Sequence, residues 1–227
     1  MTGYFPLIVP QDLICEESPI LNYSTLMESG CNNEIHTKER ALISGESTKR
    51  QNEFITGRIC ARRALKNLQI YNFPILFNEH KLPLFPSTVK GSIAHTSSYC
   101  AVVLGLDLKY KSIGIDIEHI SKMKGRYFNT LCTNEELLFL KKYSEQEQME
   151  KATILFSAKE AFYKLQFQIT QKMLFFKDVC CSIFDDNTFS IRLCKQLDKQ
   201  FYYNATFAGL FYISDGMIFT ILHLEAD

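Results

Sequence analysis

Two carboxylates, Asp116 and Glu118, stand one residue apart in an apolar run that covers residues 112–119. Isoleucines alternate with the other positions, so a strand would send the isoleucines to one face and both acids to the opposite face. Positions two apart have Cα atoms roughly 6–7 Å from each other, a span that two carboxylates can close around one hard cation. A half-buried strand with a solvated acidic face is the alternative. Gly114 lies on the acidic face, where it is expected to let a ligand approach the backbone.

A third acid lies in a predicted helix over residues 150–166. This segment has no Gly or Pro and is rich in Ala, Leu, Lys, Glu and Gln. Between its two apolar flanks runs a narrow polar stripe of Thr153, Ser157, Glu160 and Lys164. Such a stripe must face a partner or a polar cleft. Glu160 and Lys164 are four residues apart, so they either form an ion pair that stabilises the helix or serve a metal-assisted phosphate reaction.

A histidine and a basic segment precede these acids. His95 follows a short apolar run and precedes three hydroxyl residues, so we expect it at a strand end, either in contact with phosphate or in a structural role. Residues 49–66 hold six basic residues against a single acid and are predicted to form a helix. Arg58 lies at the edge of its core-facing stripe and needs an anion, carboxylate or phosphate, whereas Arg62 is expected on a solvated face. Without interleaved aromatic residues, the segment does not indicate nucleic-acid binding.

The whole chain has the composition of one compact enzyme. Its 227 residues are 46% hydrophobic with zero net formal charge, which supports a substantial core and argues against a polyanion as the main partner. We expect two α/β halves, residues 1–111 and 112–227, with hairpins at 183–189 and 213–218. Eight cysteines without a C-x-x-C pair suit reduced thiols in the cytoplasm. No targeting signal or apolar stretch indicates a membrane.

Four segments together resemble the 4′-phosphopantetheinyl transferases of the enterobactin-synthase component D and surfactin type. They span about residues 40–165, in that family's order and with its spacing. The matching segments are Lys49-Arg50…Phe54…Gly57-Arg58, Pro83…Phe85-Pro86…Gly91-Ser92-Ile93…His95, Gly114-Ile115-Asp116-Ile117-Glu118 and Phe156-Ser157-Ala158-Lys159-Glu160-Ala161…Lys164. Three positions depart from the family's usual form: Phe156 replaces a common Trp, Thr96 a frequent Ser, and Leu82 a common Gly beside the basic residue assigned to Lys81.

The resemblance implies transfer of the phosphopantetheine arm of coenzyme A to a serine of an acyl or peptidyl carrier protein, with release of adenosine 3′,5′-bisphosphate. It implies a monomer of two similar α/β halves related by a pseudo-twofold, with coenzyme A between them and Mg²⁺, or Mn²⁺, as cofactor. The implied metal ligands are Asp116, Glu118 and Glu160. The resemblance leaves open whether Glu160 is the third ligand, the base that takes the serine proton, or both, and Lys164 would stabilise charge on the leaving oxygen. The implied phosphate contacts are Arg50, Arg58, Lys81, His95, Lys159 and Lys164.

Three questions stay open from the sequence. Lys122, Lys124 and Arg126 form either a docking surface for an acidic carrier protein or an ordinary solvated loop. A metal-dependent pyrophosphate hydrolase acting on a nucleotide-like substrate would use the same acids and lysine. A non-catalytic module that binds coenzyme A or a carrier protein would need only the basic residues.

Overall fold

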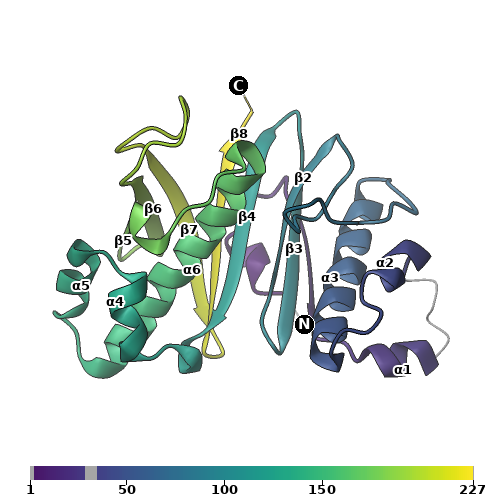
Figure 1. The fold of residues 1–227 in the computed structure, drawn as a ribbon, viewed down its shortest axis with the longest axis horizontal. Helices are drawn as coiled ribbons and strands as arrows, with labels where there is room; N and C mark the ends of the chain where they lie inside the picture. Colours follow the sequence, from purple (N-terminus) through teal and green to yellow (C-terminus); the bar gives the residue numbers. More distant parts are fainter. Residues whose placement is uncertain (1–2, 29–34, 227) are drawn as a thin grey trace. The chain divides into compact units, whose positions relative to one another are not determined.

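The computed structural model describes residues 3–28 and 35–226, and in it the chain divides into two compact units. The first unit runs to Lys111 and resumes at Ala226, whereas the second covers Ser112–Glu225. Each unit combines helices with its own β-sheet (Figure 1), which confirms the expected α+β class. The pseudo-twofold relation between the halves stays a prediction.

The first unit packs one long helix on a small sheet. The sheet has the strand order β1-β3-β2, and both pairings are antiparallel. The elements, in chain order, are η1 (Phe5–Leu7), β1 (Ile14–Pro19), α1 (Tyr23–Glu28), α2 (Thr37–Ala41), α3 (Thr48–Asn67), β2 (Val89–His95) and β3 (Tyr99–Leu106). His95 is the last residue of β2, at the strand end that the sequence predicts.

Helix α3 is the basic helix expected at residues 49–66. The hydroxyl of Ser47 caps it by accepting the backbone N–H of Arg50, which satisfies one of the orphan donors of the first turn. Its apolar side packs on the sheet through a cluster that includes Ala61, Leu65 and Val102. Burial of that face fixes the rotation of the helix and therefore the direction of each basic side chain.

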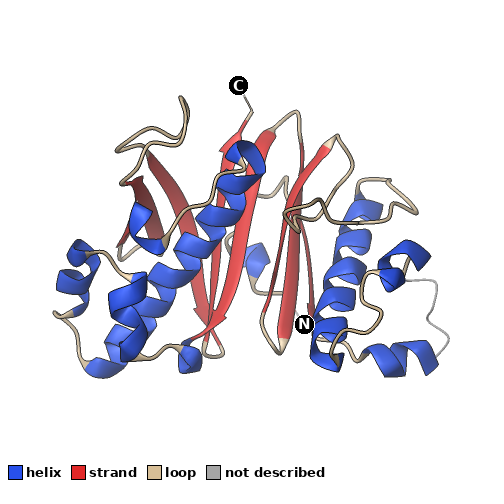
Figure 2. Cartoon of the chain, viewed as in Figure 1, coloured by secondary structure: helices blue, strands red, loops and turns tan. Residues whose placement is uncertain are grey.

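The second unit covers its sheet with the longest helix of the described chain. The sheet order is β4-β8-β7-β6-β5, and α6 lies across one face (Figure 2). The elements are β4 (Tyr110–His119, its first residues in the first unit), η3 (Ile120–Lys122), η4 (Gly125–Tyr127), α4 (Phe128–Leu131), α5 (Asn134–Leu140), α6 (Glu145–Thr170), η5 (Phe176–Asp178), β5 (Val179–Ile183), β6 (Thr188–Leu193), β7 (Thr206–Ser214) and β8 (Met217–Glu225).

Both hairpins predicted in this unit are confirmed. Strands β5 and β6 pair antiparallel across residues 184–187, and β7 and β8 pair antiparallel across Asp215 and Gly216. These two residues have φ angles of +49° and +70°, so they form the left-handed two-residue turn whose twist suits an antiparallel pair.

Helix α6 extends beyond the predicted segment 150–166 at both ends. Ser144 and Glu147 begin it with a reciprocal capping box, and it ends at Thr170 before Gln171, which has a φ of +52°. Its apolar residues join the strands of the sheet in one core, including Phe162, Phe189 and Ile218. Because the apolar flanks of this helix are buried in the core, its polar residues are confined to the narrow stripe between them.

The burial of the strand with the two acids decides against the alternative of a half-buried strand with a solvated acidic face. The segment 112–117 of β4 is buried throughout, so the face that holds Asp116 is not a solvated acidic face. The role of Gly114 also differs from the predicted one, which was to let a ligand approach the backbone. A Cβ at Gly114 would lie 2.0 Å from the carbonyl oxygen of Ala161, so the missing side chain admits the backbone of α6 rather than a ligand.

We expect Gly114→Ala to destabilise the protein because the new methyl group meets helix backbone, which cannot move aside as a side chain can. Overpacking of this kind typically costs about 1–3 kcal/mol, and at this chain length 1 kcal/mol corresponds to a Tm change of about 2–4 °C. Thermal unfolding measures the effect. Gly125→Ala is the matched control, because its Cβ would be 3.7 Å from the nearest atom, the flexible end of Met149. Equal melting temperatures for the two variants would contradict this reading of Gly114.

The remaining sequence expectations concern cysteines and membranes. The seven cysteines within residues 3–28 and 35–226 are free thiols, and Cys31 lies outside the described residues. In the described part of the chain, every helix is too short or too polar to cross a membrane.

Candidate active site

Asp116 is the centre of a buried polar cluster between β4 and α6. Its carboxylate accepts a hydrogen bond from each side: Lys164 Nζ lies 2.7 Å from Oδ1, and Ser157 Oγ lies 3.0 Å from Oδ2. Lys164 also donates to the carbonyl oxygen of Ile115 at 3.0 Å. Two residues of the polar stripe, Ser157 and Lys164, therefore meet the acidic strand, which is the polar partner that the enclosed stripe required.

Glu118 and Glu160 lie near enough to Asp116 for their charges to interact. Burial, followed by the charge of Asp116, raises the pKa of Glu118 to about 7. The same two causes raise the pKa of Glu160, and the cation of Lys164 opposes both shifts. Three carboxylates in one partly desolvated place repel one another, and a cation bound among them would relieve that repulsion.

The donor set fits a hard divalent cation, because Mg²⁺ and Mn²⁺ prefer carboxylate oxygens. The acids are not gathered for it in this conformation: within residues 3–28 and 35–226, no three acidic, histidine or cysteine side chains are arranged to hold a metal ion. Instead, Lys164 supplies the positive charge beside Asp116. Asp116, Glu118 and Glu160 are the residues that would hold the cation.

The raised pKa of Glu118 predicts a specific pH dependence of stability. A carboxyl group with a folded pKa of about 7 and an ordinary value of 4.5 binds more protons in the folded state between these limits. The free energy of unfolding should therefore fall as pH rises from about 4.5 to about 7. Glu118→Gln should reduce this slope in thermal unfolding scans recorded with EDTA. An unchanged slope in the variant would show that the carboxyl group is not held neutral by its surroundings.

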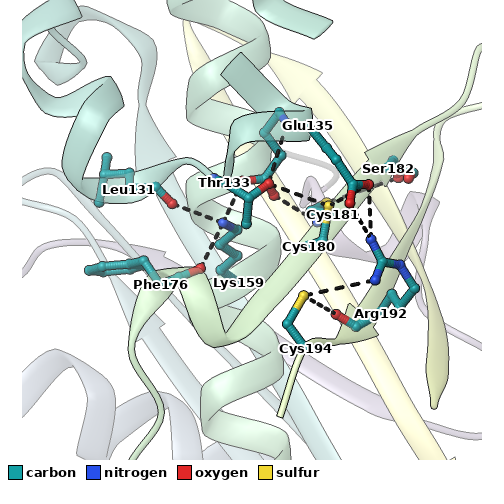
Figure 3. Close-up of polar contacts among 11 residues, drawn as sticks. Leu131, Thr133, Glu135, Lys159, Phe176, Cys180, Cys181, Ser182, Arg192 and Cys194 are labelled. Carbon is teal, nitrogen blue, oxygen red and sulfur yellow. Dashed lines mark hydrogen bonds and ion pairs between the residues drawn. The ribbon is translucent and has the colours of Figure 1, made fainter. Parts of the chain in front are cut away.

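The phosphate contact expected of Lys159 requires a correction, because this side chain does not face the cluster around Asp116. Its side chain is 1% exposed, and its ammonium donates to Glu136 Oε2 at 2.7 Å and to the carbonyl oxygens of Leu131 and Phe176, each at 2.8 Å (Figure 3). An ammonium group has three N–H donors, and all three are used. The phosphate contact expected of Lys159 is therefore replaced by a structural role, which is to join α6 to α4, α5 and η5.

Glu136, the partner of Lys159, is a residue that the sequence analysis missed. Its second oxygen accepts the backbone N–H of Cys181 at 2.7 Å, so the ion pair also reaches β5. The only local signal was the capping box that Thr133 and Glu136 form at the start of α5. That motif predicts a helix start, but it says nothing of a partner 23 residues further along the chain.

Arg58 is buried in the first unit between two aromatic rings. Its guanidinium lies 4.3 Å from the ring centre of Phe54 and 4.6 Å from that of Phe77, and Nε donates to the carbonyl oxygen of Ile75 at 2.8 Å. Burial lowers its pKa to about 10, a shift that the charge of Glu39 opposes and that the charge of Arg50 supports. Among the described residues, Nη2 has no hydrogen-bond partner. No carboxylate of the described residues bonds to Nη2, and the phosphate contact of Arg58 stays a prediction.

Arg62 is not on a solvated face, as the sequence analysis expected. It forms an ion pair with Glu39, whose side chain is fully buried and which also accepts the backbone N–H of Ile75 at 2.8 Å. The Nη1 atom of the same guanidinium group also donates to the carbonyl oxygen of Phe73. Glu39 and Arg62 thus hold the segment 73–75, whose Ile75 carbonyl in turn orients Arg58.

Two further basic candidates, His95 and Lys81, lie in different settings. His95 Nδ1 is 3.9 Å from Glu53 Oε2, an ion pair when the histidine is protonated, and Lys49 lies 3.8 Å from the other oxygen of the same acid. Lys81 is exposed in a tight turn with a φ of +61°, a conformation that glycine adopts most easily. Lys81, not Leu82, therefore occupies the left-handed position, and the N–H of Leu82 donates to Asn78 Oδ1.

The cluster of the second unit can perform proton transfer and charge stabilisation at one place. A carboxyl group of raised pKa, such as Glu160, is a better general base than an ordinary one. An ammonium with 30% of its side chain exposed, such as Lys164, can meet an anionic oxygen without complete desolvation. Together with a divalent cation, a base and an ammonium group of this kind are the groups that displacement at phosphorus requires.

Comparison with known proteins gives the same family for both units. The family described as 4′-phosphopantetheinyl transferase N-terminal domain matches residues 38–105, and the 4′-phosphopantetheinyl transferase superfamily matches residues 112–213. The 4′-phosphopantetheinyl transferase PptT of Mycobacterium tuberculosis is 33% identical over 151 residues, which cover 66% of each chain. The transferase Npt of Nocardia iowensis is 32% identical over 143 residues, 63% of this chain and 64% of that one.

A solved holo-(acyl-carrier-protein) synthase from Bacillus anthracis str. Ames aligns with 52% of this chain and 99% of its own, at 17% identity and a TM-score of 0.41. The sequence matches to the two transferases span just under two thirds of those relatives' length. On the two consecutive family matches, which together cover most of the chain, the protein belongs to the 4′-phosphopantetheinyl transferase superfamily, in the form that has a separate N-terminal domain.

Proposed function

We propose that this protein transfers the 4′-phosphopantetheine group of coenzyme A to a serine of an apo carrier protein. The observation that carries the proposal is the placement of Asp116 on β4 against Ser157 and Lys164 of α6, with Glu118 and Glu160 within range of its charge. A pyrophosphate linkage is anionic, so the reaction needs both the acids for a cation and a lysine for the leaving oxygen.

In the proposed step, the serine oxygen of the carrier forms a bond to the β-phosphorus of coenzyme A. The bond from that phosphorus to the bridging oxygen breaks, and adenosine 3′,5′-bisphosphate leaves with the electron pair. Glu160 takes the proton of the serine hydroxyl, a role that the raised pKa of its carboxyl group favours. Lys164 donates hydrogen bonds to the oxygen on which charge develops. A bound Mg²⁺ or Mn²⁺ would supply further neutralisation of the phosphate charge.

The basic residues of the first unit are proposed to contact the phosphates of coenzyme A. Arg50, Arg58, Lys81 and His95 are the candidates, and the buried Nη2 of Arg58 has no hydrogen-bond partner among the described residues. Because several cations would share the anionic ligand, the affinity for coenzyme A should weaken as ionic strength rises.

The carrier protein is proposed to dock near the short helical turns after β4. Lys122, Lys124 and Arg126 follow the acidic strand, and Arg126 lies over the ring of Tyr127 at 5.0 Å, which orders one of the three cations. Lys122 also contributes to the charge balance of Glu118. We also propose that the protein is a monomer located in the cytoplasm. The free thiols are in keeping with that location.

One assay tests the function against its rivals. The full chain is incubated with coenzyme A, Mg²⁺ and an apo acyl or peptidyl carrier protein, and the carrier is then weighed by mass spectrometry. Transfer predicts a gain of one phosphopantetheine, which EDTA abolishes and added Mg²⁺ restores. Breakdown of coenzyme A without a heavier carrier would mean a pyrophosphate hydrolase. Intact coenzyme A and an unchanged carrier, despite measurable binding, would mean a non-catalytic binding module.

A further inference from the structure

Two buried hydroxyl groups, those of Ser157 and Thr220, form a hydrogen-bonded chain that ends on Asp116. Ser157 Oγ is 3.0 Å from Asp116 Oδ2 and 2.9 Å from Thr220 Oγ1. The three side chains come from β4, α6 and β8, and their residues are 0–5% exposed. Buried hydroxyl groups that meet one another and a carboxylate form a network in which each hydrogen has a defined direction.

The hydrogens of this network can be assigned from their donors. A carboxylate that is paired with an ammonium has only acceptor sites, so Ser157 must donate its hydroxyl hydrogen to Asp116. Thr220 then supplies the hydrogen for its own contacts, with Ser157 Oγ at 2.9 Å or with the Ser157 carbonyl oxygen at 3.1 Å. A hydrogen from Thr220 on Ser157 Oγ keeps the serine hydrogen directed at the carboxylate, whereas one on the Ser157 carbonyl oxygen ties Thr220 to the same turn of α6.

The behaviour of Ser157 is unusual for a helical serine. A hydroxyl in a helix commonly bonds back to the carbonyl oxygen four residues earlier. Thr153, one turn before Ser157 on α6, does this with Met149 at 2.6 Å. Ser157 uses its hydrogen on a different element, so its hydroxyl contributes to the position of Asp116 rather than to the helix.

The two oxygens of Asp116 are therefore held by separate donors. The torsion of a carboxylate about its last bond is broad, so a single contact would leave its plane poorly defined. Lys164 on Oδ1 and Ser157 on Oδ2 fix this plane, and each oxygen keeps a lone pair for a further partner. Groups that orient a metal ligand in this way commonly alter metal affinity when they are removed.

We propose that Ser157 and Thr220 are positioning residues that aim the Asp116 carboxylate at the divalent cation of the transfer reaction. This inference rests on the proposed function, because that function supplies the cation. Neither hydroxyl group touches the reacting atoms, so their removal should change the affinity for the cation more than the affinity for coenzyme A.

Two variants and one control test the proposal on the full chain. Ser157→Ala removes the donor to Asp116, and Thr220→Val removes the second hydroxyl while nearly keeping the shape of the side chain. Thr153→Val is the matched control, because it removes a buried hydroxyl of the same helix that bonds only within the helix. The readouts are the Mg²⁺ concentration for half-maximal carrier modification, the KM for coenzyme A, and Mn²⁺ binding followed by electron paramagnetic resonance, with coenzyme A alone as the blank.

Ser157→Ala should raise the half-maximal Mg²⁺ concentration and the dissociation constant of Mn²⁺ by about 10-fold, with the KM for coenzyme A almost unchanged. Thr220→Val should shift both in the same direction by less, Thr153→Val should shift neither, and Ser157→Thr should restore most of the affinity. Wild-type cation affinity in both variants, with carrier modification by the wild type intact, would overturn the inference and leave the proposed function standing. A wild-type protein that does not modify the carrier would overturn the function itself.

Discussion

Lys164→Met should lower the turnover number for carrier modification by about 10²–10³-fold, the usual loss when one donor to a developing oxyanion is removed. Methionine keeps most of the apolar stem of lysine, and 30% of the lysine side chain is exposed, so the fold should survive the change. The loss should be mainly in kcat, because the charge that Lys164 meets is largest when the bridging oxygen leaves.

The measurement is a time course of carrier modification by mass spectrometry, with thermal unfolding of the same samples. Lys151→Met is the control, since Lys151 lies on the same helix and contacts Glu150 and Tyr143 rather than Asp116. If Lys164→Met unfolded and its folded fraction kept wild-type activity, Lys164 would be a structural partner of Asp116 and the catalytic role would be lost.

Lys159→Met should act in the opposite way, on stability. It leaves Glu136 buried without its cation, and such a break in a buried pair typically costs about 3–5 kcal/mol. Because domains are stable by only about 5–15 kcal/mol, a large part of the protein should be unfolded at moderate urea concentrations. The free energy of unfolding from urea titration, followed by circular dichroism, measures the effect.

The double variant Lys159→Met/Glu136→Gln separates the charge from the packing. The glutamine carries no charge and keeps an oxygen for the N–H of Cys181, so the double variant should recover part of the lost stability. A stable Lys159→Met protein with a large loss of turnover would instead support the phosphate contact that the sequence resemblance implied, and would contradict the structural role.

Local sequence patterns predicted the elements of the second unit but not the different partners of Lys159 and Lys164. Period-2 alternation predicted β4, and the absence of Gly and Pro with an enclosed polar stripe predicted α6 and a polar partner for that stripe. The turn residues at 184–187 and 215–216 predicted both hairpins. Each of these features depends on residues only a few positions apart, which is the range over which backbone geometry imposes a period.

The order of the motifs along the chain likewise determined the family, and the matches at 38–105 and 112–213 confirm it. The proposed roles of Asp116 and Lys164 follow from the same motifs, because each residue lies within one of them. Ser157 appeared in the polar stripe, but its bond to Asp116 and Thr220 could not be foreseen from that stripe alone.

Only the tertiary structure decided which charged residues are structural. Lys159 and Lys164 belong to one motif, yet Lys159 meets Glu136 and Lys164 meets Asp116 because α6 buries one side against α5 and β5 and the other against β4. Gly114 serves the approach of Ala161, and Arg58 is enclosed by Phe54 and Phe77. These partners lie far away in sequence, and the burial of a charge or a glycine depends on how separate elements pack, which no local period specifies.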